Sequence, residues 1–275
     1  MKVVLFCGGL GMRLKEYSEI IPKPMINIGY RPILWYVMKY YAHFGHKEFI
    51  LCLGYKADII KNYFLNYNEY MSNDFTLSSG GRELALKSID IQDWKITFVD
   101  TGLTSTVGER LRLVEPYLKG EEMFLANYSD GLADLDLPAY VEYFTRRKRI
   151  ASFLSVSVPH TFHIVEADED HQVRSLEAVA RSAIRINGGF FVFRRQIFDY
   201  IDEGDDLVLK PFERLMRERQ LLAYPFDGFW KNMDTFKDKQ ELDTLLARSA
   251  APWQVWKRES AAAPERKAPA RWGTR

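Results

Sequence analysis

The chain has 275 residues and a formal net charge of +1; 47% of its residues are hydrophobic and 27% are charged. This length allows one sizeable core, or a core with a small appended lobe. The balanced charge gives no electrostatic reason to expect nucleic acid or an anionic membrane as a partner. No apolar run approaches the roughly 20 residues that span a bilayer. We therefore expect an ordinary soluble globular protein with neither of those partners.

The first residues and the two cysteines bear on the compartment. The apolar run Val3–Cys7 is shorter than the roughly 7–15 residues of a secretory signal core, so we interpret it as a buried strand. Cys7 and Cys52 both lie in apolar, strand-like runs. This placement is typical of buried free thiols and indicates neither a disulfide framework nor a metal site. Together these features predict a cytoplasmic protein.

The first half of the chain alternates strand-like and helix-like segments. Continuous apolar runs predict buried parallel strands, and the longer amphipathic stretches between them predict helices. The expected strands are Val3–Cys7, Phe49–Leu53, Lys95–Asp100 and Met123–Tyr128, and the expected helices are Ile33–Phe44, Lys56–Phe64 and Arg110–Leu118. This alternation predicts an α/β fold with a mostly parallel, doubly wound sheet. In such sheets ligands bind at the carboxyl ends of the strands.

The second half has shorter strands separated by turn residues, which predicts a mixed continuation of the sheet. Strands are expected at Ala151–Val158, Phe162–Ala167, Val173–Leu176, Ile184–Phe193 and Leu221–Tyr224, and helices at Gln196–Ile201, Pro211–Arg219 and Thr235–Ala247. We expect one domain over residues 1–256. Residues 257–275, rich in Ala, Pro and Arg without periodicity, are expected to form a disordered tail.

One segment of the first half does not fit the alternation. Asp74–Trp94 carries a Gly80-Gly81 turn and the alternating apolar residues Leu84, Leu86 and Ile89, which predicts a hairpin-like insertion with one apolar face. Because such a face usually packs against another surface, we expect a closed homo-oligomer.

The loop after the first strand carries the strongest chemical signal. It runs Gly8-Gly9-Leu10-Gly11-Met12-Arg13-Leu14, and Pro22-Lys23-Pro24-Met25 follows. Glycines at a strand end let backbone N–H groups approach phosphates, and a nearby cation neutralises the phosphate charge. The pattern matches neither the GxGxxG nor the GxxxxGK[ST] fingerprint. The glycines alone would fit a plain tight turn equally well, but Arg13 and Lys23 favour phosphate binding.

Together these residues resemble the signature of the sugar-phosphate nucleotidyltransferases, which is close to GGxGTRL followed by a KP-type motif. The resemblance continues in chain order and covers residues 1–256. It includes the segments Gly29–Trp35, Asp100–Gly102, Tyr128–Gly131, Asn187–Phe191, Phe229–Thr235 and Ala251–Trp253. Within that family the sequence is most similar to the glucose-1-phosphate cytidylyltransferases, which are oligomeric. The resemblance implies a fold of the nucleotide-diphospho-sugar transferase type.

The resemblance also implies an activity and a set of site residues. The enzyme would transfer a nucleoside monophosphate from an NTP, with CTP favoured, to a sugar 1-phosphate or related acceptor, releasing pyrophosphate. The nucleotide would be bound by Gly8, Gly9, Leu10, Gly11, Met12, Arg13, Lys23, Ser105, Arg110 and Ser129, with Arg13 and Lys23 as catalytic residues. The acceptor would meet Asn187, Gly188 and His163, and Mg²⁺ would be held by Asp130 and Asp234.

The two aspartates also suit a metal site on physical grounds. Asp130 ends a buried strand, where a carboxylate is costly unless it meets a cation. Asp234 follows an aromatic pair and precedes a helix. Two such carboxylates can hold one Mg²⁺ that also bridges substrate phosphates. Each has an ordinary alternative, because Asp234 could cap the helix and Asp130 could be a turn residue.

The sequence departs from the family pattern at three single residues and in the acceptor half. Met12 replaces the usual Thr, Ser129 a Gly before the metal aspartate, and Glu109 a Gly before Arg110. The family's Glu-Lys-Pro motif, whose Lys contacts the acceptor phosphate, falls near Leu176-Glu177-Ala178-Val179, where no lysine occurs. His163 stands where the family has Gly.

Two explanations of the acceptor changes remain open. Either Arg181 or Arg185 supplies the lost charge, or the acceptor is not glucose 1-phosphate. Two other functional classes are also possible. A catalytically silent, nucleotide-binding homologue would account for the lost lysine, and a metal-dependent glycosyltransferase would share the sheet and the carboxylates. The glycosyltransferase hypothesis leaves the loop from Gly8 to Lys23 unexplained.

Overall fold

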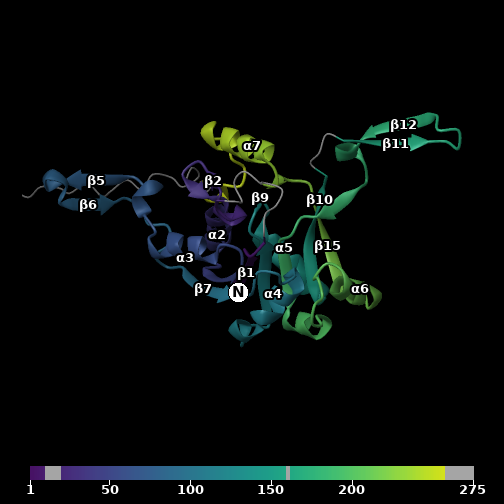
Figure 1. The fold of residues 1–275 in the computed structure, drawn as a ribbon, viewed down its shortest axis with the longest axis horizontal. Helices are drawn as coiled ribbons and strands as arrows, with labels where there is room; N and C mark the ends of the chain where they lie inside the picture. Colours follow the sequence, from purple (N-terminus) through teal and green to yellow (C-terminus); the bar gives the residue numbers. More distant parts are fainter. Residues whose placement is uncertain (10–19, 159–161, 258–275) are drawn as a thin grey trace, which may run out of the picture.

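One large mixed sheet forms the centre of the molecule (Figure 1). The computed structural model describes residues 1–9, 20–158 and 162–257. The eight strands of this sheet are β1 (Val3–Phe6), β4 (Glu48–Leu53), β7 (Lys95–Asp100), β8 (Met123–Tyr128), β10 (Ala151–Ser157), β13 (Arg185–Asn187), β14 (Phe191–Arg194) and β15 (Leu221–Phe226). β1 pairs in parallel with β4 and β8, and β4 pairs in parallel with β7. The parallel half predicted from the sequence is therefore confirmed.

The second half of the sheet is mixed, also as predicted. β14 runs antiparallel to β8, and β10 runs antiparallel to β13 and β14 but parallel to β15. The prediction of one strand over Ile184–Phe193 is wrong, because a bend between β13 and β14 divides this segment into two strands. Gly189 and Phe190 adopt left-handed backbone angles there, with φ of 74° and 50°. A side chain at Gly189 would come within 2.5 Å of the Asn127 carboxamide oxygen, so the sharp bend requires glycine.

Helices cover both faces of the sheet. Alternate residues of β1 face opposite sides, so that Val3 and Leu5 join one buried cluster and Val4 and Phe6 join the other. The first cluster includes side chains from α2 (Ile33–His43), α3 (Ala57–Leu65), α5 (Leu137–Arg147) and α7 (Phe236–Ala247). The second includes side chains from α4 (Val107–Leu113) and α6 (Lys210–Arg217). The doubly wound arrangement is thus confirmed.

The boundaries near α4 differ from the predicted helix Arg110–Leu118. The helix begins earlier because Thr106 caps it, accepting a hydrogen bond from the backbone N–H of Glu109 at 3.2 Å. It ends before Pro116, and a 3-10 helix covers Glu115–Leu118. The predicted helix Gln196–Ile201 is likewise a 3-10 helix, at Arg195–Tyr200. The remaining short elements are 3-10 helices at Lys23–Met25, Glu69–Met71, Ser79–Gly81 and Val179–Arg181, and the strands β2 (Asn27–Ile28), β3 (Arg31–Pro32), β9 (Gly131–Ala133) and β16 (Trp230–Asn232).

Two hairpin arms project from opposite ends of the molecule in Figure 1. One is formed by β5 (Phe75–Ser78) and β6 (Glu83–Leu86), which confirms the predicted insertion. The other is formed by β11 (His163–Ala167) and β12 (Val173–Ala178). The predicted tail lies outside the described residues except for Lys257. Within the described part of the chain, no helix is long and apolar enough to cross a membrane.

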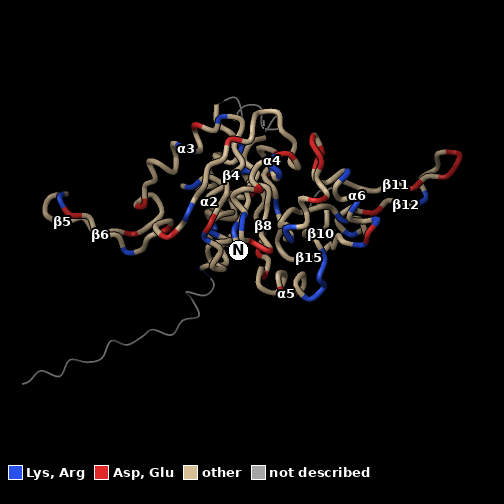
Figure 2. The backbone as a smooth tube through the Cα atoms, turned by 90° about the horizontal axis from the view of Figure 1, so that it is seen from below, with Lys and Arg blue, Asp and Glu red and all other residues tan. Residues whose placement is uncertain are grey.

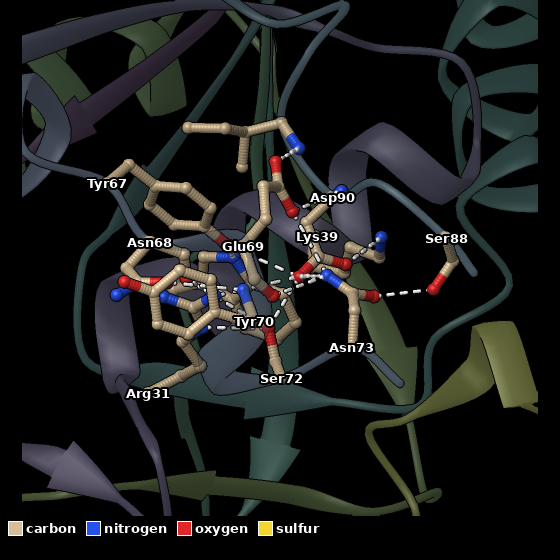
Figure 3. Close-up of polar contacts among 12 residues, drawn as sticks. Arg31, Lys39, Tyr67, Asn68, Glu69, Tyr70, Ser72, Asn73, Ser88 and Asp90 are labelled. Carbon is tan, nitrogen blue, oxygen red and sulfur yellow. Dashed lines mark hydrogen bonds and ion pairs between the residues drawn. The ribbon is translucent and has the colours of Figure 1, made fainter. Parts of the chain in front are cut away.

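A network of polar side chains anchors the β5–β6 arm to the body of the protein (Figure 3). The Arg31 guanidinium donates to the backbone oxygen of Asn68 at 2.6 Å and lies over the Tyr67 ring, 4.2 Å from its centre. The Asp90 carboxylate accepts from the Ser72 hydroxyl at 2.6 Å and from the Lys39 ammonium at 3.0 Å. Burial alone would raise the pKa of Asp90, but these donors outweigh it and hold the pKa below its usual value.

Candidate active site

A cleft of about 680 Å³ opens at the carboxyl ends of β1 and β8, where the parallel sheet predicts ligand binding. Its walls come from six separate parts of the chain. They are formed by Phe6, Cys7, Gly8, Gly9, Lys23, Pro24, Leu103, Thr104, Ser105, Thr106, Val107, Arg110, Tyr128, Ser129, Asp130, Asp206 and Asp234. The cleft therefore brings together the predicted metal residues and every predicted nucleotide residue that the structure describes. Leu10, Gly11, Met12 and Arg13 lie outside the described residues.

Gly8 is constrained by a neighbour as well as by any ligand. A Cβ atom at Gly8 would lie 2.1 Å from a guanidinium nitrogen of Arg110, so any side chain here would collide with this buried group. Gly9, by contrast, has open space around it. The first glycine is thus required by internal packing, whereas the second leaves its backbone accessible from the cleft.

Arg110 ties together the strand ends that form one wall of the cleft. Its guanidinium donates to the backbone oxygens of Gly8 at 3.1 Å, Leu53 at 3.1 Å and Gly102 at 2.9 Å, and to the Thr101 hydroxyl at 2.7 Å. These acceptors follow or end β1, β4 and β7. Burial lowers the pKa of Arg110 from its usual value. In this structure Arg110 orders the wall through protein contacts, and direct binding of nucleotide by Arg110 stays a prediction.

Two serines line the cleft with their hydroxyls already engaged. Ser105 donates to the backbone oxygen of Thr101 at 2.5 Å, which closes the turn before α4. Ser129 is buried and donates to the backbone oxygen of Phe6 at 2.8 Å. The replacement of the family's Gly by Ser129 is therefore accommodated by a bond between the ends of β8 and β1.

Lys23 and the two predicted metal ligands meet at one point. The Lys23 ammonium donates to Asp234 Oδ1 at 2.5 Å and forms a second ion pair with Asp130. Burial alone would lower the pKa of Lys23, but the two carboxylates outweigh that effect and raise the pKa above its usual value. All three side chains are partly buried in the cleft, so their attraction is screened less than that of a surface pair.

A short ladder brings the two aspartates together. β9 and β16 pair antiparallel, with Gly131 opposite Asn232, so that Asp130 and Asp234 both flank the pair. The backbone N–H of Met233 also donates to the Asp130 carbonyl at 3.0 Å. This local pairing explains how aspartates from distant segments reach one site.

The chemistry of this pair fits a hard divalent cation. Two carboxylates converge on a single positive group, and the Lys23 ammonium shows that a cation is accommodated between them. Among the described residues no group of three or more His, Cys, Asp or Glu side chains could hold a metal. A metal held by Asp130 and Asp234 would therefore take further ligands from substrate phosphates and water, which is the usual manner of Mg²⁺.

The predicted acceptor residues lie outside the walls of this cleft. Asn187 accepts from the backbone N–H of Gly189 at 2.9 Å, and the Gly188 carbonyl accepts from the Trp230 indole at 2.8 Å. Asn187 is the last residue of β13, and Gly188 begins the bend that leads to β14. His163 is exposed on the β11–β12 arm. The structure thus gathers the nucleotide and metal residues but leaves His163 apart from them.

The two sequence changes in the predicted acceptor half, at His163 and near Ala178, lie next to each other in the structure. In the antiparallel arm His163 lies directly opposite Ala178, at the end of the arm nearest the sheet. Of the two arginines that could replace the lost lysine, Arg185 is engaged with Asp227 at 2.8 Å and with the Phe226 carbonyl at 2.8 Å. Arg181 is exposed just beyond β12. The structure therefore favours Arg181 over Arg185 as a free cation.

Asp206 is a cleft residue that the sequence did not indicate. Its neighbour Asp205 is buried, and the Asp205 carbonyl accepts from the Thr106 hydroxyl at 2.7 Å. Gly108 allows this approach, because a Cβ atom there would lie 2.3 Å from the same carbonyl oxygen. No local pattern near Asp206 signals this contact, which depends on packing between segments far apart in the chain.

The fold and the cleft define a nucleotide-dependent α/β transferase, with a glycine turn, a cationic side chain and paired carboxylates at the carboxyl edge of a parallel sheet. Comparison with known proteins makes this specific. A family model described as nucleotidyl transferase matches residues 2–247. The glucose-1-phosphate cytidylyltransferase of Salmonella typhi is 39% identical over 258 residues, which cover 93% of this chain and 100% of that protein. The chain belongs to the nucleotidyl transferase family.

Solved structures support the same fold. HddC from Yersinia pseudotuberculosis matches with a TM-score of 0.63 at 22% identity, covering 89% of this chain and 99% of that chain. A UDP-glucose pyrophosphorylase in complex with UDP-glucose matches with a TM-score of 0.67 at 15% identity, covering 90% and 98%. These likenesses confirm the predicted fold class, and the family model and the Salmonella relative confirm the predicted family.

Proposed function

We propose that the protein transfers a cytidylyl group from CTP to a sugar 1-phosphate or a closely related acceptor and releases pyrophosphate. One observation carries this proposal: Lys23, Asp130 and Asp234 contact one another in a cleft that Gly8 and Gly9 also line. The similarity to a glucose-1-phosphate cytidylyltransferase over almost the whole chain supports the choice of CTP and acceptor. The comparisons give no support to the catalytically silent alternative.

The reaction needs no protein nucleophile. A phosphate monoester with a second pKa near 6 is largely a dianion at neutral pH, so an acceptor oxygen can attack the α-phosphorus directly. A new P–O bond then forms to the acceptor, and the bond to the pyrophosphate oxygen breaks. The residues of the cleft have to align the two substrates and neutralise the phosphates, which is the general logic of phosphoryl transfer.

Each cleft residue has a proposed part in this task. The Gly9 backbone and the Lys23 ammonium would contact the triphosphate, together with Arg13 from the segment outside the described residues. Arg110 would hold the wall beside the nucleotide through its bonds to Gly8 and Gly102. Asp130 and Asp234 would hold Mg²⁺, which when bound neutralises charge on the phosphates.

Pyrophosphate release from the purified protein tests the proposal. CTP, UTP, dTTP and GTP would each be combined with glucose 1-phosphate and with other sugar 1-phosphates, with and without Mg²⁺. We expect CTP to be the best donor and release to require the metal. No release with any pair would contradict the enzymatic function, and a clear preference for another NTP would contradict the choice of base.

We also propose that the protein is a homo-oligomer, as a face of the β5–β6 arm suggests. Phe75 lies opposite Leu86 and Leu77 opposite Leu84, so these four side chains share one face of the hairpin. Phe75, Leu77 and Leu84 are exposed in the single chain. A second copy covering this face would bury them. Light scattering that shows a monomer at micromolar concentration would refute this proposal, and Leu77→Asp should dissociate the oligomer.

A further inference from the structure

The Lys23 ammonium lies where a metal bound by the two aspartates would have to bind. It contacts a carboxylate oxygen of Asp234 at 2.5 Å and forms an ion pair with Asp130 at the same time. The oxygens that would coordinate a metal are thus already used by an internal cation. All three side chains line the cleft formed by the described residues, so Lys23 can change partner within that cleft.

Electrostatics makes simultaneous binding unfavourable. A divalent ion a few ångströms from an ammonium group is repelled by it, and the repulsion is strong in a partly buried site because screening there is weak. A positive neighbour stabilises the two carboxylates, since two like charges in a partly buried site repel each other. Lys23 supplies that neighbour until another cation arrives.

The backbone at Lys23 is conformationally restricted. The residue sits in a 3-10 turn between Pro22 and Pro24, in which Met25 N–H donates to the Pro22 carbonyl at 2.8 Å. Pro24 is buried and the prolines restrict the backbone angles. A change of partner by Lys23 is therefore a rotation of its four-carbon stem within the cleft it already lines.

We propose that Lys23 and the divalent metal exchange places during substrate binding. In the free protein Lys23 neutralises Asp130 and Asp234 and keeps the metal site closed. When the metal arrives with a nucleoside triphosphate, the metal takes the carboxylates and Lys23 turns to the phosphates. This inference rests on the proposed function for the identity of the incoming ligand, and it adds that Lys23 controls metal affinity.

The exchange has a thermodynamic consequence. Without nucleotide, the metal must displace Lys23 from its partners, so the metal alone binds weakly. The triphosphate gives Lys23 new anionic partners and thereby makes displacement favourable. Nucleotide and metal should each strengthen the binding of the other by the same factor, because such coupling is reciprocal.

Mn²⁺ binding to the nucleotide-free protein tests the exchange without measuring catalysis. Water-proton relaxation would give the Mn²⁺ affinity of the unmodified full chain and of Lys23→Met, which removes the charge and keeps most of the side-chain length. We expect Lys23→Met to bind Mn²⁺ at least tenfold more tightly, although it should be a poor enzyme. A lysine whose ammonium does not compete with the metal for Asp130 and Asp234 would not produce this gain.

Matched variants locate the effect. Lys47→Met makes the same charge change at an exposed pair with Asp93 and should leave Mn²⁺ affinity unchanged. Adding Asp130→Asn to Lys23→Met should abolish the gain. Lys23→Gln replaces the methionine variant if that one does not fold. Mn²⁺ affinity that stays equal or falls in the neutral variants overturns the exchange. Pyrophosphate release by the unmodified protein tests the proposed function separately, since active enzyme without the affinity gain would refute only the exchange.

Discussion

The predicted nucleotide side and the predicted acceptor side of the sheet are built differently. On the nucleotide side, Arg110 and Ser129 lock the ends of parallel strands through bonds to backbone oxygens. On the predicted acceptor side, His163 and Ala178 lie on a projecting arm, and neither belongs to the buried clusters of the core. Three departures from the family pattern, at Met12, Glu109 and Ser129, fall on the predicted nucleotide side, where Ser129 joins two strand ends. The departures on the arm join no strand ends of the central sheet. A substitution on the nucleotide side therefore has to keep the strand ends joined, whereas one on the arm does not.

The largest expected effect falls on the nucleotide side, at the metal pair. Asp130→Asn or Asp234→Asn should abolish turnover and leave the fold intact, because each removes a charge from the proposed Mg²⁺ site at nearly constant size. Steady-state pyrophosphate release and circular dichroism would measure the two properties. Asp136→Asn is the matched control, since asparagine can still cap α5 there and activity should persist. Near-normal turnover in either site variant would contradict the assignment of that carboxylate.

The next largest effects on activity are expected at Arg13 and Lys23, the two cationic residues predicted to contact phosphate. Lys23→Ala and Arg13→Ala should each cost about 2–4 kcal/mol of transition-state stabilisation, the scale of one preorganised electrostatic contact. The value follows from the ratio of kcat/KM between variant and unmodified enzyme. Lys47→Ala, at an exposed ion pair, should change little. Unchanged kcat/KM in both loop variants would reduce the loop to a structural turn.

The β5–β6 arm allows a prediction about stability rather than activity. The β5–β6 arm is held by Asp90, whose pKa is lowered in the folded protein. A carboxylate with a lowered pKa stabilises the fold above its unfolded pKa, near 4, and loses that contribution as the pH falls through the folded value. Asp90→Asn should therefore destabilise the protein by roughly 2–3 kcal/mol at pH 7, since it weakens a buried charged network.

Urea unfolding at several pH values checks this prediction. The difference between Asp90→Asn and the unmodified protein should shrink below about pH 4. Glu142→Gln, at an exposed pair with Arg146, provides a control that should change stability by less than about 1 kcal/mol. A difference that stays constant down to low pH would show that the Asp90 charge does not stabilise the arm.

Local patterns predicted most strands and helices, because buried parallel strands are continuous apolar runs and α2 begins directly after Pro32. The glycine-containing loop also indicated Lys23, and the family resemblance indicated Asp130 and Asp234. They could not predict that Lys23 bridges the aspartates, since that depends on the pairing of β9 with β16. The break at Gly189 and the position of Asp206 were missed for the same reason. Both result from contacts between segments distant in the chain, which local periodicity does not encode.

The smallest expected effect on activity falls on the β11–β12 arm, where it gives the most specific test of the difference between the two sides of the sheet. Because His163 and Ala178 are opposite each other on one ladder, their side chains project to the same face and lie close together. The His163 imidazole thus lies opposite the segment Leu176–Val179, near which the family's lysine is expected. The loop at the far end of the arm is acidic, with Asp168, Glu169 and Asp170, and would repel a phosphate (Figure 2).

If this pair sets acceptor preference, the protein should use glucose 1-phosphate poorly while binding its NTP well. Losing one charge-assisted contact to a phosphate is worth roughly 1.5–3 kcal/mol, or about ten- to a hundredfold in acceptor efficiency. The double variant His163→Gly with Ala178→Lys should recover that factor with glucose 1-phosphate and leave the KM for CTP unchanged. Arg181→Ala serves as the companion variant, because a large loss there would identify this exposed arginine as the replacement cation. The deciding measurement is the acceptor profile of the unmodified protein with CTP. A kcat/KM for glucose 1-phosphate above about 10⁴ M⁻¹s⁻¹, the lower end of the range for ordinary enzymes, would refute a changed acceptor. The exchange of side chains across the ladder would then be a neutral change on an arm that the core does not constrain.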